Sequence, residues 1–189
     1  MNIVFGGTFN PPTIAHEKAI QTVLSALQVD RFIIVPVGNK YHLKTIEEDE
    51  HRFSMLELIS KKLGVELSRI ELDSKCYSGT YSLLKKMNLN DTLFLIGSDN
   101  LKEIKNWIDP EKLINEFGLV VLSRKDDCEA IINSDELLTK YKEKIIIIND
   151  FDYDISSTMF RETLNFDLVS DEVKKYIKKN ELYGGNHVS

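Results

Sequence analysis

The sequence has few cysteines and no apolar segment long enough to cross a bilayer. Its two cysteines, Cys76 and Cys128, lie far apart and away from any histidine cluster, so neither a disulfide framework nor a zinc site is indicated. Acidic residues outnumber basic residues by 30 to 24, and the formal net charge of −6 argues against a nucleic-acid partner. An apolar run begins at residue 2 and leaves no room for a signal peptide, so we expect a cytoplasmic protein with no membrane partner.

The length of 189 residues suits one α/β domain spanning residues 1–189. Short β-rich runs alternate with helical patterns, which predicts parallel strands joined by crossover helices. The expected strands are 3–5, 32–37, 70–72, 93–96, 119–122 and 145–148. The runs at 32–35 and 145–148 are apolar throughout, as in central strands covered on both faces. We therefore expect a doubly wound, mostly parallel, Rossmann-like sheet with a helical C-terminal end.

The N-terminal segment combines two glycines, a helix start and a histidine. Gly6 and Gly7 follow the first strand and carry no Cβ that would keep backbone N–H groups away from an anion. The next helix, which Thr13 can cap, would present the positive end of its dipole to the same place, with His16 on its first turn. The segment therefore predicts a phosphate-binding loop.

A second hydroxyl-rich segment lies near the C-terminus and reads Ile155-Ser156-Ser157-Thr158-Met159-Phe160-Arg161. Three hydroxyls at a helix start, with Arg161 one turn later, would all point at one locus, which suits a polyphosphate. The structural alternative is a helix cap, which needs only one hydroxyl, from Ser157 or Thr158.

The N-terminal segment resembles the signature of the nucleotidyltransferase superfamily, a Gly-Gly-x-Phe-Asp/Asn-Pro loop followed by a His/Thr-x-Gly-His element. That element reads Thr13-Ile14-Ala15-His16 here, with alanine in place of glycine. The C-terminal segment resembles the superfamily's Ile-Ser-Ser-Thr-x-x-Arg element. Further matches make nearly the whole chain similar to the nicotinate mononucleotide adenylyltransferases: 36–44, 51–52, 78–80, 95–99, Trp107, 119–124 and 173–183.

This resemblance implies transfer of the adenylyl group of ATP to nicotinate mononucleotide, forming deamido-NAD and pyrophosphate in NAD biosynthesis. It implies Mg²⁺ carried with ATP and no residues dedicated to a metal. The implied catalytic residues are His16, Thr13 and Arg161. The implied ATP-binding residues are Gly7, Thr8, Phe9, His16, Gly97, Asp99, Ile155, Ser156, Ser157 and Arg161. The implied acceptor-binding residues are Lys40, His42, Lys44, Thr80, Trp107 and Arg124.

Rival functions stay open at this point. A phosphopantetheine adenylyltransferase would keep the fold and shares the threonine variant at Thr13, although Trp107 and the 78–80 loop argue against it. Nicotinamide mononucleotide is an alternative acceptor. Backbone amides can recognise the carboxylate of the nicotinate compound, so no particular side chain in the sequence distinguishes the two acceptors. A non-catalytic nucleotide sensor is the alternative from another class, in which Ala15 has compromised turnover.

Single residues have structural alternatives as well. Trp107 could close the edge of a core, and His42 could be an ordinary loop histidine. Arg52 is expected to pair with Glu48 or Asp49 at the start of a helix. The oligomeric state leaves no trace in this sequence.

Overall fold

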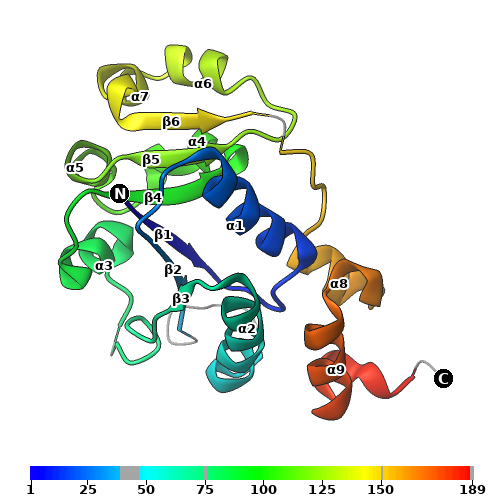
Figure 1. Ribbon diagram of the computed structural model, residues 1–189. Helices are drawn as coiled ribbons and strands as arrows, with labels where there is room; N and C mark the ends of the chain where they lie inside the picture. The colour runs from blue at the N-terminus through cyan, green and yellow to red at the C-terminus, as the bar shows by residue number, and fades with distance from the viewer. Residues whose placement is uncertain (39–46, 75, 150, 188–189) are drawn as a thin grey trace.

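The computed structural model describes residues 1–38, 47–74, 76–149 and 151–187 and contains one parallel six-stranded sheet (Figure 1). The strands are β1 (Asn2–Gly7), β2 (Arg31–Pro36), β3 (Glu66–Leu67), β4 (Thr92–Gly97), β5 (Leu119–Leu122) and β6 (Ile145–Ile148). Their order is β3-β2-β1-β4-β5-β6, and every neighbouring pair is parallel. The direction of winding therefore reverses between β1 and β4, the place where such sheets bind ligands.

Helices cover both faces of the sheet, so the predicted doubly wound fold is confirmed (Figure 1). On one face lie α1 (Ile14–Ala26), α2 (Asp49–Leu63), α8 (Ser157–Thr163) and α9 (Asp171–Lys179). On the other lie α3 (Gly79–Met87), α4 (Ser98–Glu103), α5 (Pro110–Glu116), α6 (Cys128–Ser134) and α7 (Glu136–Lys140). Strand side chains alternate between the faces, so adjacent residues such as Ile33 and Ile34 belong to different cores. No helix within the described ranges has the length and apolar character of a bilayer span.

The predicted strand at 70–72 is wrong. Strand β3 lies earlier, where Glu66 and Leu67 pair with Ile33 and Ile34 of β2. Residues 70–72 form a turn, in which the Asp73 N–H donates to the Arg69 carbonyl at 2.9 Å. Leu72 lies in this turn and its side chain is buried, so an apolar residue is needed here for packing and does not indicate a strand.

The predicted central position of the 145–148 strand is also wrong. Strand β6 pairs with β5 alone at the edge of the sheet, and its four isoleucines are only half-buried. A strand that is partly buried on both faces has the same continuous apolar sequence as one that is fully buried, so the sequence does not separate an edge strand of this kind from a central strand.

Strands β1 and β4 separate toward their carboxyl ends. Their pairing runs from Asn2–Thr92 to Val4–Phe94 and then stops, although β1 continues to Gly7 and β4 to Gly97. The ends of the two strands are thus released from each other at the point where the winding reverses. This opening positions the candidate site.

Candidate active site

Two cavities lie at the separated ends of β1 and β4, one of about 550 Å³ and one of about 230 Å³. They share the wall formed by Phe5, Gly6, Gly7, Thr8, Gly97 and Asn100. The larger cavity extends to Thr80 and Trp107, and the smaller one extends to His16, Asp99, Arg124 and Ile155. Two ligands could therefore occupy the two cavities and meet at the Gly6–Thr8 loop.

The shared wall is backbone because its glycines have no space for side chains. A Cβ on Gly6 would lie 2.9 Å from the ring of Phe94, and a Cβ on Gly7 would lie 3.1 Å from the ring of Phe9. Both rings belong to the core. Gly6 and Gly7 are the last two residues of β1, paired with Val35 and Pro36, and not a loop after the strand as the sequence predicted. Together with Thr8 they bring main-chain atoms to the border between the cavities.

His16 lies on the first turn of α1, as predicted, and a hydrogen bond defines its tautomer. Thr13, the N-cap residue, donates its backbone N–H to His16 Nδ1 at 2.9 Å. Because Nδ1 accepts this bond, Nε2 carries the ring proton and is free to act as a donor.

The imidazole of His16 is neutral at physiological pH. Its ring packs against the rings of Phe9, at 5.0 Å between centroids, and Phe5, at 6.1 Å. Burial, and to a smaller extent the positive charge of Arg124, together lower the pKa of His16 to about 4. His16 therefore presents the smaller cavity with a preorganised N–H donor and no charge.

Arg124 brings a positive charge to the smaller cavity. It follows β5 on a short loop, and its Nε is buried without a hydrogen-bond partner among the described residues. The loop is braced on both sides, because Ser123 Oγ donates to the Asp126 carbonyl at 2.8 Å and the Asp126 carboxylate accepts from Ser98 Oγ at 2.6 Å. The sequence assigned Arg124 to the acceptor, whereas it lies beside His16, Asp99 and Ile155, the residues expected for ATP.

The hydroxyls of the 155–161 segment do not point at one locus, which corrects the prediction. Ser156, and neither of the two candidates, caps α8 by accepting from the Met159 N–H at 3.1 Å. Ser157 Oγ donates to the Pro11 carbonyl at 2.7 Å. Thr158 Oγ1 accepts from Arg161 at 3.0 Å. Each hydroxyl satisfies a nearby backbone or side-chain group, so the three diverge.

Arg161 supports the loop that contains Asn10 and Pro11. Its Nη1 donates to the Asn10 carbonyl at 2.6 Å, next to the bond that Ser157 makes to Pro11. Neither residue lines the two cavities in the present structure. Their described contacts are those of loop-positioning residues.

Trp107 lies both at the edge of a core and on the wall of the larger cavity. Its ring packs edge-to-face against Phe94, at 6.1 Å between centroids, and also forms part of the wall of the larger cavity. Thr80, on the first turn of α3, lines the same cavity. Three other predicted acceptor residues, Lys40, His42 and Lys44, lie outside the described residues.

Arg52 contributes to the site in a way that sequence reasoning missed. The predicted pair with Asp49 is confirmed, but the fully buried guanidinium also donates to the carbonyls of Thr8 and Val37, both at 2.6 Å. It thereby ties the start of α2 to the ends of β1 and β2. No local pattern signals a bond between residues 44 positions apart.

Tyr183 is a second residue that the sequence did not assign to the site. Its hydroxyl donates to Asn10 Oδ1 at 2.7 Å, and Asn10 is almost completely buried. The C-terminal end of the chain therefore holds the same loop that Arg161 and Ser157 support.

Comparison with known proteins finds relatives of this chain. The chain matches the cytidylyltransferase-like family model over residues 4–163. A "Probable nicotinate-nucleotide adenylyltransferase" from Acholeplasma laidlawii is 38% identical, covering 97% of each chain. One of the same name from Fusobacterium nucleatum is 36% identical, covering 93% of this chain and 96% of the relative.

Among solved structures, Plasmodium falciparum nicotinic acid mononucleotide adenylyltransferase complexed with NaAD is similar, with a TM-score of 0.78 and 27% identity. The superposition covers 98% of both chains. The likeness thus extends over the sheet, both helical layers and the C-terminal helices.

Proposed function

We propose a function from the premise that this chain belongs to the cytidylyltransferase-like family and, within it, to the nicotinate-nucleotide adenylyltransferases. It transfers the adenylyl group of ATP to nicotinate mononucleotide, a step of NAD biosynthesis that yields deamido-NAD and pyrophosphate. The observation that carries this conclusion is the pair of adjoining cavities that share the Gly6–Thr8 loop. The reaction has to bring two phosphorylated substrates together at one point, and the shared loop offers that point.

In the reaction, an oxygen of the mononucleotide phosphate attacks the α-phosphorus of ATP in line. The new P–O bond forms as the bond to pyrophosphate breaks, and pyrophosphate leaves with the electron pair. The attacking phosphate is already deprotonated at neutral pH, so no strong general base is needed. Catalysis then depends on positioning two anions and on neutralising the charge that develops between them.

The residues of the smaller cavity suit this task. His16 offers an N–H donor held by Thr13, and Arg124 offers a cation with an unpaired donor. We assign ATP to this cavity, with Gly7, Thr8, Phe9, Gly97, Asp99 and Ile155 around it. Ser156, Ser157 and Arg161 act on ATP through the loop that α8 supports.

The larger cavity suits the pyridine mononucleotide. Its wall combines the Trp107 ring, on which a pyridine can stack, with polar groups such as Thr80. The phosphate of this substrate lies toward the shared Gly6–Thr8 loop, and the ring lies toward Trp107.

Transfer from ATP uses a divalent metal ion, and we infer that Mg²⁺ serves here. Among the described residues no three His, Cys, Asp or Glu side chains cluster as a metal site would require. Asp99 is the carboxylate that lines the smaller cavity within the described ranges, and none of the other polar side chains there, Thr8, His16, Asn100 and Arg124, is anionic. This donor set fits an ion held mainly by phosphates and water, which would offset the charge of the phosphates.

A panel of acceptors tests the assignment. The protein is incubated with ATP, Mg²⁺ and nicotinate mononucleotide, nicotinamide mononucleotide or phosphopantetheine, and the product is identified by mass. We expect rapid pyrophosphate release with the nicotinate compound and a lower kcat/KM with its amide, because N–H donors suited to a carboxylate are poorly matched by an amide NH₂. ATP binding without pyrophosphate release from any acceptor would support the sensor, and adenylylated phosphopantetheine would support the rival transferase.

A further inference from the structure

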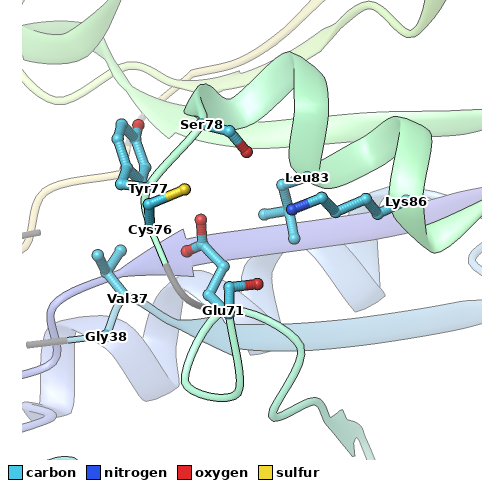
Figure 2. Close-up of a pocket in the computed structure, with 9 residues that line it drawn as sticks. Val37, Gly38, Glu71, Cys76, Tyr77, Ser78, Leu83 and Lys86 are labelled. Atoms are coloured by element: carbon cyan, nitrogen blue, oxygen red, sulfur yellow. The ribbon is translucent and has the colours of Figure 1, made fainter. Parts of the chain in front are cut away.

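A small pocket opens beside the larger cavity and contains an ionisable carboxyl group. The pocket measures about 20 Å³ and is lined by Val37, Glu71, Cys76, Tyr77, Ser78 and Lys86, among others. Glu71 and Tyr77 also line the larger cavity, so Glu71 lies on the wall between the two spaces. Figure 2 shows the Glu71 carboxyl group pointing into the pocket, with the Lys86 side chain reaching toward it from α3.

The carboxyl group of Glu71 changes its charge near neutral pH. Burial raises the pKa of Glu71 from an ordinary 4.5 to about 7, and the positive charge of Lys86 opposes this rise. The other ionisable side chains that line the pocket are Cys76 and Tyr77, on the segment before α3. The end of β2 contributes Val37 and Gly38, which carry no charge. Within the described residues, Lys86 is thus the charged group that faces Glu71.

The two pyridine acceptors differ only where a carboxylate replaces a carboxamide. With the phosphate at the Gly6–Thr8 loop, the ring would extend into the larger cavity, whose lining includes Trp107, Thr80 and Glu71. An ionised Glu71 repels a carboxylate there and does not repel a neutral amide, whereas a protonated Glu71 tolerates both.

We propose that Glu71 is a specificity-determining residue, whose charge sets the preference between a pyridine mononucleotide with a carboxylate and one with a carboxamide. The inference rests on the proposed function, because it assumes that the larger cavity receives the pyridine mononucleotide. It adds to that function a dependence of acceptor choice on pH.

The test measures kcat/KM for nicotinate and nicotinamide mononucleotide between pH 6 and 8 and follows their ratio. Both substrates carry the same phosphate and ribose, so ionisation of those groups cancels in the ratio. We expect the ratio of acid to amide to fall about fivefold from pH 6 to 8, because a bound carboxylate that raises the pKa of Glu71 by about one unit weakens its own binding about tenfold once Glu71 is fully ionised, a limit reached above pH 8.

Three variants sharpen the test. Glu71→Gln removes the ionisable group, so its ratio stays at the high, low-pH value throughout. Lys86→Met removes the charge that lowers the pKa of Glu71, so the midpoint of the change moves to higher pH. Asp73→Asn is the matched control, because it removes an equal charge from the same turn at a side chain that is 68% exposed and outside both spaces. This control keeps the wild-type pH dependence.

The outcomes separate this inference from the proposed function. If the wild-type protein adenylylates nicotinate mononucleotide with an acid-to-amide ratio that is constant from pH 6 to 8, the role of Glu71 is refuted and the function stands. If neither pyridine mononucleotide is a substrate, the function itself fails. If Glu71→Gln does not fold, Lys86→Met decides. A change in the acid-to-amide ratio that has the same midpoint pH as in the wild type refutes the inference, and a higher midpoint pH supports it.

Discussion

Replacement of His16 by alanine tests the mechanism most directly. The variant loses the Nε2–H donor, which faces the smaller cavity because Nδ1 is bound to Thr13. One preorganised donor to developing negative charge is worth about 10²–10³ in kcat, and we expect a loss of this size. The assay is pyrophosphate release at saturating ATP and nicotinate mononucleotide, with His51→Ala as the matched control. His51 contacts Tyr176 on α9 and lines neither cavity, so its variant retains nearly full kcat.

The protonation state of His16 sharpens this prediction. Since the pKa of His16 is lowered to about 4, the neutral ring predominates in the free enzyme from pH 6 to 8. His16 therefore adds no titration step to the kcat/KM for ATP in that range. A profile that rises tenfold per unit toward low pH, and loses this slope in His16→Ala, would show a required imidazolium. Near-full kcat in His16→Ala would remove the residue from the mechanism.

The lowered pKa of His16 also affects stability. The ordinary value of 6.5 applies to the unfolded chain, which binds a proton before the folded protein does as pH falls toward 4. Stability from this group is therefore present above pH 6.5 and is lost between 6.5 and 4. The loss is about 3 kcal/mol at most, since one pKa unit corresponds to about 1.4 kcal/mol. Urea unfolding of the wild type and of His16→Ala at pH 6.5 and pH 4 measures this loss in the free energy of unfolding. If the free energy of unfolding changed equally with pH in both proteins, the lowered pKa of His16 would be contradicted.

Three further predictions follow from the described contacts. Trp107→Ala raises the KM for nicotinate mononucleotide about tenfold and changes the KM for ATP little, because stacking on one substrate is lost; equal changes in both KM values would indicate a purely structural role. Tyr183→Phe loses the bond to Asn10, so calorimetry should show a destabilisation of about 1 kcal/mol together with a raised KM for ATP; an unchanged KM would separate this bond from the site. Ala15→Gly lowers stability by about 1 kcal/mol and changes kcat/KM for ATP less than tenfold, because Ala15 lies within α1. Since Ala15 also lines the smaller cavity, a larger gain in kcat/KM would show that its methyl group crowds the nucleotide.

Local patterns in the sequence were sufficient for the elements that carry the site. The Gly6-Gly7 pair after an apolar run, Thr13 as a cap and His16 on the first helical turn all depend on neighbours within a few residues. Spacing therefore encodes them, and the structure confirms the cap and the position of His16. The glycine pair ends β1 and does not follow it. The alternation of strands and helices likewise predicted the doubly wound sheet, although it misplaced β3 because a buried turn has the same apolar composition as a short strand.

Tertiary structure alone decided which distant groups meet. The bonds from Ser157 to Pro11 and from Arg161 to Asn10 join residues about 150 positions apart, and no local period encodes such a contact. Ser157 and Arg161, which the sequence directed at ATP, thus contact the loop at Asn10 and Pro11 instead.

Charge states were equally hidden in the sequence. The pKa of His16 is lowered and that of Glu71 is raised because folding removes water from both side chains, and Lys86 moderates the second effect. The sequence determined which chemical groups the site contains and the order in which the chain presents them. Their partners, their exposure to water and hence their charge depend on packing between elements remote in the chain, which only the folded structure brings together.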